Sequence, residues 1–116
     1  DELSNHEYSS ETSEQIVERV VRARNIQNER FKDQPGIFSN AQMPSRMVRD
    51  VCELTPAGAN LLKTAMTRLQ LSARAYDRIL KVARTGADLA GSADIKIEHL
   101  AEAIQYRSLD REGWAG

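Results

Sequence analysis

The sequence predicts an all-α fold class, a small bundle of four or five helices. Apolar residues recur at spacings of three and four along several segments, and no segment of useful length shows the alternation of a β-strand. Aromatic residues make up only 5% of the chain, so aliphatic side chains and alanine must fill the core, and that mixture favours helices. With 116 residues, the chain has room for one hydrophobic core and therefore for one domain.

The first segments are a polar tail and a long helix. Residues 1–12 bury too little apolar surface to offset the entropy of ordering them, so we interpret them as a flexible tail or linker. A helix is predicted over residues 13–31, with Ser13 as its N-cap. The apolar residues that recur in it at helical spacing are Ile16, Val17, Val20, Val21 and Ala23. We expect this face to pack in the bundle and the opposite, mixed-charge face to meet solvent.

A loop and a short helix follow. Pro35 lacks a backbone donor and Gly36 tolerates positive φ, so the chain is expected to break there. Residues 45–52 then predict a short helix, because apolar residues are spaced at one, three and four along it. These are Met47, Val48, Val51 and Cys52.

Capping signals define the remaining helices. Thr55 and the proline after it predict a helix start, because the hydroxyl accepts from free N–H groups and proline needs no donor at the first position. This helix should end near Gln70. Ser72 caps the next helix, which should stop at Gly91. The last helix is predicted over residues 97–107.

The motifs of several kinds of chemistry are missing. The sequence contains neither GxxxxGK[ST] nor GxGxxG, the usual glycine-rich phosphate-binding motifs. Cys52 is the only cysteine and has apolar neighbours, which favours a small buried hydrophobe over a nucleophile. His6 and His99 are far apart in the chain, and His99 is interpreted as a capping or surface residue. We therefore expect no metal site and no enzymatic activity from this chain alone.

Charge and hydropathy bound the setting of the protein. The formal net charge of -1 lacks the basic excess of an autonomous nucleic-acid-binding module. No run approaches the roughly 18 apolar residues of a membrane span, and no signal-peptide pattern opens the chain. We expect a cytoplasmic protein without membrane contact. The start at Asp1 rather than at Met suggests a fragment of a longer protein.

One arginine has an unusual position. Arg74 falls in the first turn after the Ser72 cap, where unpaired N–H groups and the helix dipole favour an anion. A guanidinium there adds a bidentate phosphate clamp, although the dipole disfavours the arginine itself by up to about 1 kcal/mol. Spacing alone leaves two interpretations open: an anion-binding arginine, or a surface arginine paired with Asp77.

Four segments carry a resemblance to a known family. They are FSNAQMP at residues 38–44, LTPAGANLLKTAMTRL at 54–69, LSARAYDRILKVARTGADLAG at 71–91 and IEHLAEAIQYRSLDR at 97–111. In this order they resemble the C-terminal domain of magnesium-chelatase-like AAA+ ATPases, most closely the bacterial competence-related branch. The resemblance covers residues 11–111. It implies that residues 13–111 form the helical lid that follows the ATPase core, with residues 112–116 as a C-terminal tail.

The family also implies roles and partners. An arginine of the SARA stretch acts there as the sensor-2 residue, which reaches the γ-phosphate of ATP, and Arg74 occupies that position. ATP and Mg²⁺ are implied as cofactors of the full-length protein, and none for the fragment. The implied partners are the AAA+ core of the same chain, neighbouring subunits of a homo-oligomeric ring, and DNA through the full assembly. Arg19, Arg22, Arg24 and Arg78 are candidate interface residues.

Three further expectations come from this comparison. Arg84, on the same helix as Arg78, is assigned to interface or surface pairing. Gly86 departs from the family pattern, which favours a larger apolar residue there, and it costs about 0.5–1 kcal/mol of helix stability relative to alanine. The alternative function is a helical adaptor or a DNA- or protein-interaction module without a nucleotide role, which the arginines of the first helix would serve.

Overall fold

The computed structural model describes the backbone of residues 12–109 and the side chains of residues 12–106. Residues 1–11 of the expected tail and all of residues 112–116 lie outside this range. The elements are α2 (Ser13–Arg30), the 3-10 helix η1 (Asn40–Gln42), α3 (Ser45–Val51), α4 (Pro56–Leu69), α5 (Ala73–Leu89) and α6 (Ile97–Leu109). No strand occurs between residues 12 and 109. The all-α prediction is therefore confirmed.

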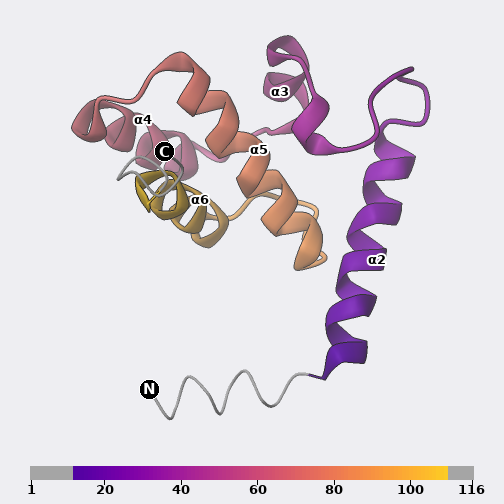
Figure 1. Ribbon diagram of the computed structural model, residues 1–116. Coiled ribbons are helices and arrows are strands. Elements are labelled where there is room, and N and C mark those ends of the chain that lie inside the picture. Colours follow the sequence, from indigo (N-terminus) through magenta and orange to yellow (C-terminus); the bar gives the residue numbers. More distant parts are fainter. Residues whose placement is uncertain (1–11, 110–116) are drawn as a thin grey trace.

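Helix α5 is the central element of the bundle. Helix α6 packs between α5 and α4, whereas α2, η1 and α3 contact α5 elsewhere along its length (Figure 1). The core is almost entirely aliphatic, as the scarcity of aromatic residues predicts. Its largest fully buried apolar side chains are Met43, Val48, Leu62, Ile79, Leu80, Ile95 and Leu100.

The predicted caps explain where α4 and α5 begin. The Thr55 hydroxyl accepts a hydrogen bond from the Gly58 N–H at 3.1 Å, and the Ser72 hydroxyl accepts one from the Ala75 N–H at 3.2 Å. Helix α4 ends at Gln70, whose φ of +52° turns the chain out of the helix. All three positions were predicted from the sequence.

Helix α5 ends in a Schellman motif around the predicted glycine. Gly91 has φ +73°, a conformation that favours glycine. Its N–H donates to the Asp88 carbonyl at 3.0 Å, and the Ser92 N–H donates to the Ala87 carbonyl at 2.8 Å. These two bonds satisfy carbonyls that the end of the helix would otherwise leave free.

The N-cap of α2 is Thr12 rather than the predicted Ser13. The Thr12 hydroxyl accepts from the Gln15 N–H at 3.1 Å, and the Gln15 side chain accepts from the Thr12 N–H at 2.9 Å. This reciprocal capping box needs a glutamine or glutamate three residues after the cap. Thr12 has Gln15 at that position, whereas Ser13 has Ile16.

The expectation that α2 buries its whole apolar face is wrong. Ala23 and Gln27 are its only buried residues. The four large aliphatic residues of its N-terminal half are exposed: Ile16, Val17, Val20 and Val21. This half extends away from the bundle (Figure 1), so no other described element covers it.

Candidate functional site

Arg74 is the second residue of α5, directly after the Ser72 cap. Its side chain is exposed, and among residues 12–106 it forms no hydrogen bond or ion pair. The first N–H groups of a helix have no partner within the helix and carry the positive end of its dipole. Guanidinium and N–H groups therefore stand together at this end of α5. Such a combination can bind a phosphate or another anion.

The alternative pairing of Arg74 with Asp77 is not formed. The Asp77 Oδ2 atom instead accepts a short hydrogen bond from the Ser45 hydroxyl at the start of α3. This contact joins α3 to α5 and satisfies the carboxylate that stands three residues after Arg74. The guanidinium of Arg74 is thereby left available to a group from outside the described residues.

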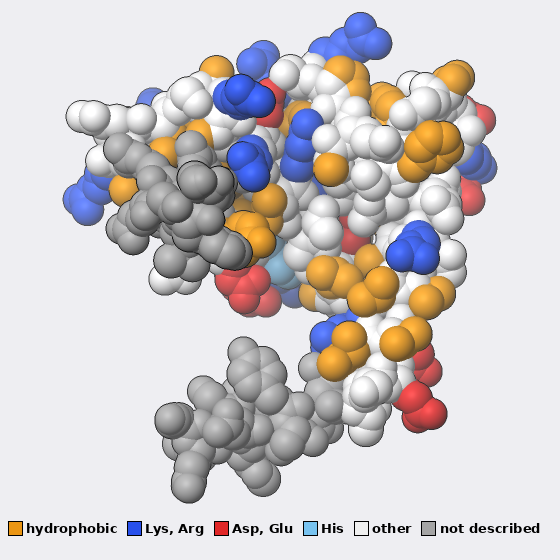
Figure 2. Space-filling model, viewed as in Figure 1, with side chains coloured by type: hydrophobic (Ala, Val, Ile, Leu, Met, Phe, Trp, Pro, Cys, Tyr) orange, Lys and Arg blue, Asp and Glu red, His pale blue; other side chains and the backbone are white. Residues whose placement is uncertain are grey.

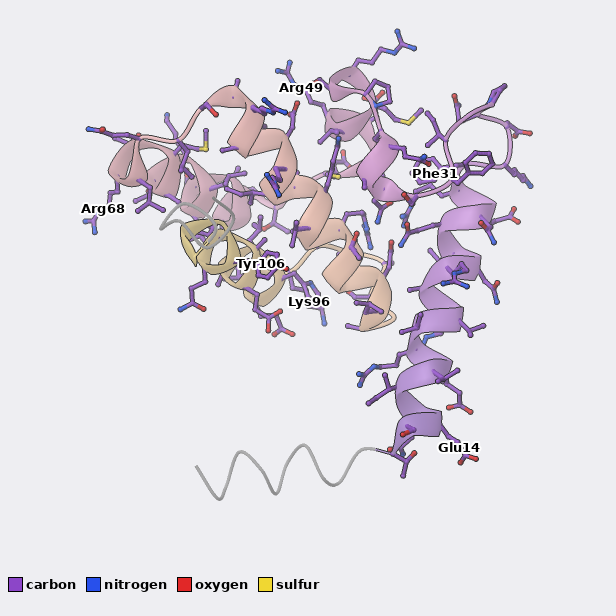
Figure 3. All side chains as sticks on the ribbon, viewed as in Figure 1. Glu14, Phe31, Arg49, Arg68, Lys96 and Tyr106 are labelled. Carbon is purple, nitrogen blue, oxygen red and sulfur yellow. The ribbon has the colours of Figure 1, made fainter. Side chains whose placement is uncertain are left out.

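More positive charge lies close to Arg74. Arg78, one turn further along α5, is also exposed and makes a contact of its own. Helix α3 packs against α5 and carries two exposed arginines, Arg46 and Arg49 (Figure 3). Sequence reasoning did not single these two out. The signal for them is the Ser45 contact with Asp77, which brings α3 to α5 and which no local pattern reveals.

The candidate interface arginines of α2 lie at the other end of α5. The Nη2 atom of Arg22 would be 3.5 Å from a Cβ built on Gly91, so its guanidinium lies against the C-terminal turn of α5. Arg19 is half-buried and has a contact, and Arg24 is exposed. Since α5 has 17 residues, its ends are about 25 Å apart. Arg78 therefore shares a site with Arg74, and Arg22 does not.

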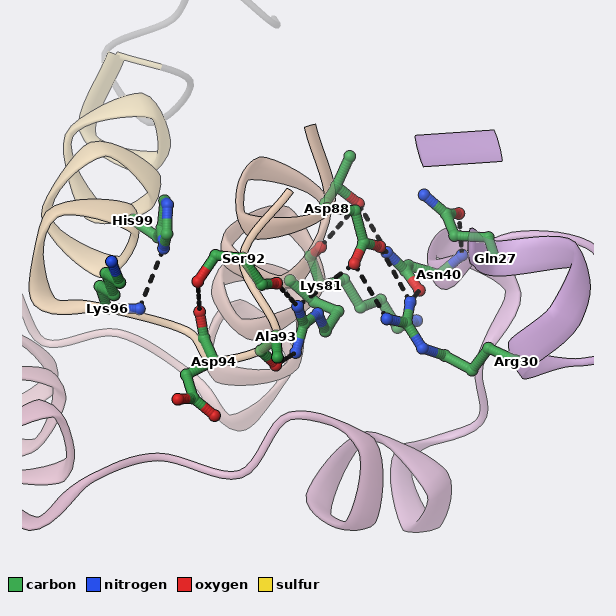
Figure 4. A network of polar contacts seen from close by, with 12 residues as sticks. Gln27, Arg30, Asn40, Lys81, Asp88, Ser92, Ala93, Asp94, Lys96 and His99 are labelled. Carbon is green, nitrogen blue, oxygen red and sulfur yellow. Dashed lines mark hydrogen bonds and ion pairs between the residues drawn. The ribbon is translucent and has the colours of Figure 1, made fainter. Parts of the chain in front are cut away.

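A buried polar network fixes α2 to α5 at this far end (Figure 4). Arg30 of α2 donates to both carboxylate oxygens of Asp88 in α5, each at 2.9 Å. The Asn40 amide donates to the same carboxylate at 3.0 Å, and Arg84 forms an ion pair with it at 3.2 Å. The backbone N–H of Asn40 donates to the Gln27 side chain at 3.0 Å. Helices α2 and α5 and the 3-10 helix η1 are thus joined around one carboxylate.

Asp88 remains ionised despite its burial. The carboxylate is 1% exposed, and burial alone would raise its pKa. Hydrogen bonds from Arg30 and Asn40, with the charges of Arg30 and Arg84, outweigh burial and hold the pKa of Asp88 below its ordinary value. The network is therefore a charged one at neutral pH.

The assignment of Arg84 to surface or interface pairing is wrong. Its side chain is 6% exposed, and besides Asp88 it binds two backbone carbonyls of the loop after α5. The Nη1 group donates to Ala93 at 3.1 Å, and the Nη2 group donates to Ser92 at 2.9 Å. Arg84 therefore holds the α5–α6 loop in place within the domain.

Cys52 and His99 have the structural roles that the sequence predicts. Cys52 is 3% exposed, and burial raises the pKa of its thiol to about 11, which keeps it protonated and weakly nucleophilic. The His99 Nδ1 atom accepts from the Lys96 N–H at 2.9 Å, so it caps the start of α6 from a buried position. Over the part of the chain that the structure describes, no three His, Cys, Asp or Glu residues are grouped as metal ligands. No helix in that part is both long and apolar enough to span a bilayer.

Gly86 lines a groove between α5 and α6. This groove has a volume of about 490 Å³, and its other lining residues include Val82, Leu89 and Ala103. A Cβ added to Gly86 would meet nothing within 4 Å. The small residue that departs from the family pattern therefore leaves the groove open, and no close packing requires it.

Comparisons with known proteins place this fold in a family. Residues 10–107 match the family described as magnesium chelatase, subunit ChlI C-terminal. The competence protein ComM of Haemophilus influenzae is 43% identical over 109 residues, which are 94% of this chain and 20% of that protein. The uncharacterized protein YifB of Escherichia coli is 40% identical over 94% of this chain and 21% of its own length. The uncharacterized protein Rv2897c of Mycobacterium tuberculosis is 34% identical over 84% of this chain and 19% of its own.

The chain thus spans about a fifth of the length of the curated relatives that it matches. The family model covers nearly all of the residues that the structure describes, from α2 to α6. The resemblance to the competence-related branch of the family is confirmed by these identities. The chain belongs to the magnesium chelatase subunit ChlI C-terminal family.

Proposed function

We propose that this chain is the helical lid of a magnesium-chelatase-like ATPase and that Arg74 is its sensor-2 residue. The observation that supports the proposal is an exposed guanidinium at the capped start of α5, without a partner among the described side chains. The bundle exposes this group on a rigid element, because Leu80, Ala83 and other buried residues hold α5 in the core. ATP would be held mainly by a core domain of the same polypeptide.

The residues at this end of α5 fit a polyphosphate rather than a metal ion. Arg74 offers two parallel N–H donors to phosphate oxygens, and Arg78 adds a second positive charge one turn away. The nearest carboxylate in the helix, Asp77, is engaged by Ser45. ATP supplies the γ-phosphoryl group that is transferred to water. Arg74 would bind its oxygens and stabilise the negative charge that develops on them, an electrostatic role.

The lid would also pass movement to neighbouring domains. Contact between Arg74 and the γ-phosphate exists only while that phosphate is in place, so its loss frees the start of α5. Because Asp88 ties α5 to α2, a displacement of α5 would carry α2 with it. In a ring of identical subunits, this would couple hydrolysis to motion of the assembly.

The test is ATP turnover in a full-length protein that carries this chain behind a phosphate-loop core. Arg74→Ala should lower kcat about 10²-fold, as removal of one transition-state donor commonly does. Arg74→Lys keeps the charge without the bidentate geometry and should fall between the two. Arg68→Ala is the matched control, because Arg68 is an equally exposed arginine in the last turn of α4 (Figure 3). Turnover by the Arg74→Ala protein equal to that of the control would refute the assignment.

A further inference from the structure

The N-terminal half of α2 has an apolar face that no described element covers. Four aliphatic residues form this α2 apolar face: Ile16, Val17, Val20 and Val21, with exposed fractions of 43%, 57%, 41% and 46%. Figure 2 shows hydrophobic side chains gathered along this arm, with charged side chains beside them. The other large apolar residues that are exposed lie apart from it, on other elements: Phe38, Ile97 and Tyr106.

The α2 apolar face continues a face that is already used for packing. Ile16, Val20, Ala23 and Gln27 follow one another at spacings of four, three and four, so they lie on one side of the helix. Ala23 and Gln27 are buried in the bundle, whereas Ile16 and Val20 are exposed. The same side of α2 therefore packs inside the domain at one end and extends beyond it at the other.

The exposed half of α2 begins where α5 stops. Arg30 pairs with Asp88, and Arg22 lies against Gly91, just past the last turn of α5. The nine residues from Ser13 to Val21 then extend for about 13 Å beyond that point. An exposed stripe of four branched aliphatic residues is costly in water and indicates a contact surface.

We propose that the α2 apolar face is where the preceding part of the full-length polypeptide packs against this domain. The matched family is a C-terminal one, and the relatives are about five times as long as this chain, so in them most of the protein precedes this domain. Glu18 and Arg22 stand beside the stripe and supply the polar rim of such a contact. The occupant is then an apolar surface with polar edges, within the same polypeptide. This inference rests on the proposed function, because it assumes the ATPase core upstream.

Hydrogen exchange tests the inference in the full-length protein and in the 116-residue chain. We expect the amides of residues 17–22 to exchange at least about 10-fold more slowly in the full-length protein, because docking suppresses local opening of the helix. Val17→Asp with Val21→Asp should return exchange in the full-length protein to the rate of the short chain. In the short chain itself the double variant should melt within about 2 °C of the wild type, since both residues are exposed there.

Ile97→Asp is the matched control. Ile97 is 43% exposed, as Ile16 is, but it opens α6, where an added carboxylate favours the helix dipole. This variant should leave exchange of residues 17–22 unchanged. Equal exchange of these amides in the short and the full-length proteins would overturn the proposal. So would a short chain that dimerises and becomes monomeric with the two aspartates, because the face would then belong to a second copy.

The two proposals fail separately. Arg74→Ala should leave α2 protected, because Arg74 lies at the opposite end of α5. Lost turnover in that variant without protection of α2 in any full-length protein would sink the docking face alone. Protected α2 with unchanged turnover would sink the sensor-2 role alone.

Discussion

Replacement of Asp88 by Asn tests the buried network that joins α2 to α5. The change keeps the shape of the side chain but removes the charge that faces Arg84 and Arg30, whose side chains are 7% and 19% exposed. Loss of one partner from a buried ion pair commonly costs about 3–5 kcal/mol of the free energy of unfolding. Arg30 retains some access to water, so we expect a cost of about 3 kcal/mol, at the lower end of this range.

Such a loss is large but leaves room for folding. Domains of this size have about 5–15 kcal/mol of stability, and 1 kcal/mol shifts Tm by about 4–8 °C, so Tm should fall by about 10–20 °C. Circular dichroism at increasing temperature measures this shift. Asp50→Asn, a change of the same type at an exposed position of α3, should leave Tm unaltered within about 2 °C. A shift as small in Asp88→Asn would show that the network contributes little.

Three further predictions concern pH, packing and ligands. Because the folded-state pKa of Asp88 is lowered, its contribution to stability should be complete above the ordinary aspartate pKa of about 3.9 and disappear as pH falls through the folded-state value. The gap in unfolding free energy between wild type and Asp88→Asn should therefore narrow in acid titrations, and a constant gap would contradict the assignment. Gly86→Ala should raise the free energy of unfolding by about 0.5–1 kcal/mol in urea titrations, since the added Cβ meets nothing within 4 Å; a loss of stability would show that the groove wall cannot accept a methyl group. The 116-residue chain alone should show little affinity for ATP or for duplex DNA in fluorescence anisotropy at about 150 mM salt, and salt-dependent DNA binding would favour the adaptor function instead.

Local chemistry made most of the helix boundaries predictable. Thr55, Ser72 and Gly91 act through hydrogen bonds or backbone conformation within a few residues, so the sequence displays their role directly. The cap of α2 was misplaced by one residue, because Thr12 and Ser13 are both good caps and only the side chain three residues later distinguishes them.

Contacts between distant segments were not predictable. Arg30 and Asp88 are 58 residues apart, and nothing in either neighbourhood announces the other. Arg84 looked like one more charged residue on a helix surface, yet its burial depends on the path of the loop that it binds. In the same way, the spacing of Val17 and Val21 shows that α2 has an apolar face but cannot tell which surface covers it.

The candidate site was only partly predictable. Position after the Ser72 cap made Arg74 a candidate, but spacing equally allowed a pair with Asp77, and the resemblance to a family decided between the two. The structure adds that Asp77 binds Ser45 of α3. That contact brings the arginines of α3 to the site, and no pattern within α5 could reveal it.

The position of the Asp88 network makes α5 a lever arm. Its clamp to α2 is near one end, and Arg74 is 14 residues away, a distance of about 21 Å along the helix axis. A tilt of about 5° around the clamp would shift the base of the Arg74 side chain by nearly 2 Å, whereas a good hydrogen bond tolerates a spread of only about 0.5 Å. Whatever rotates α2 by a few degrees would therefore make or break the phosphate contact at the far tip.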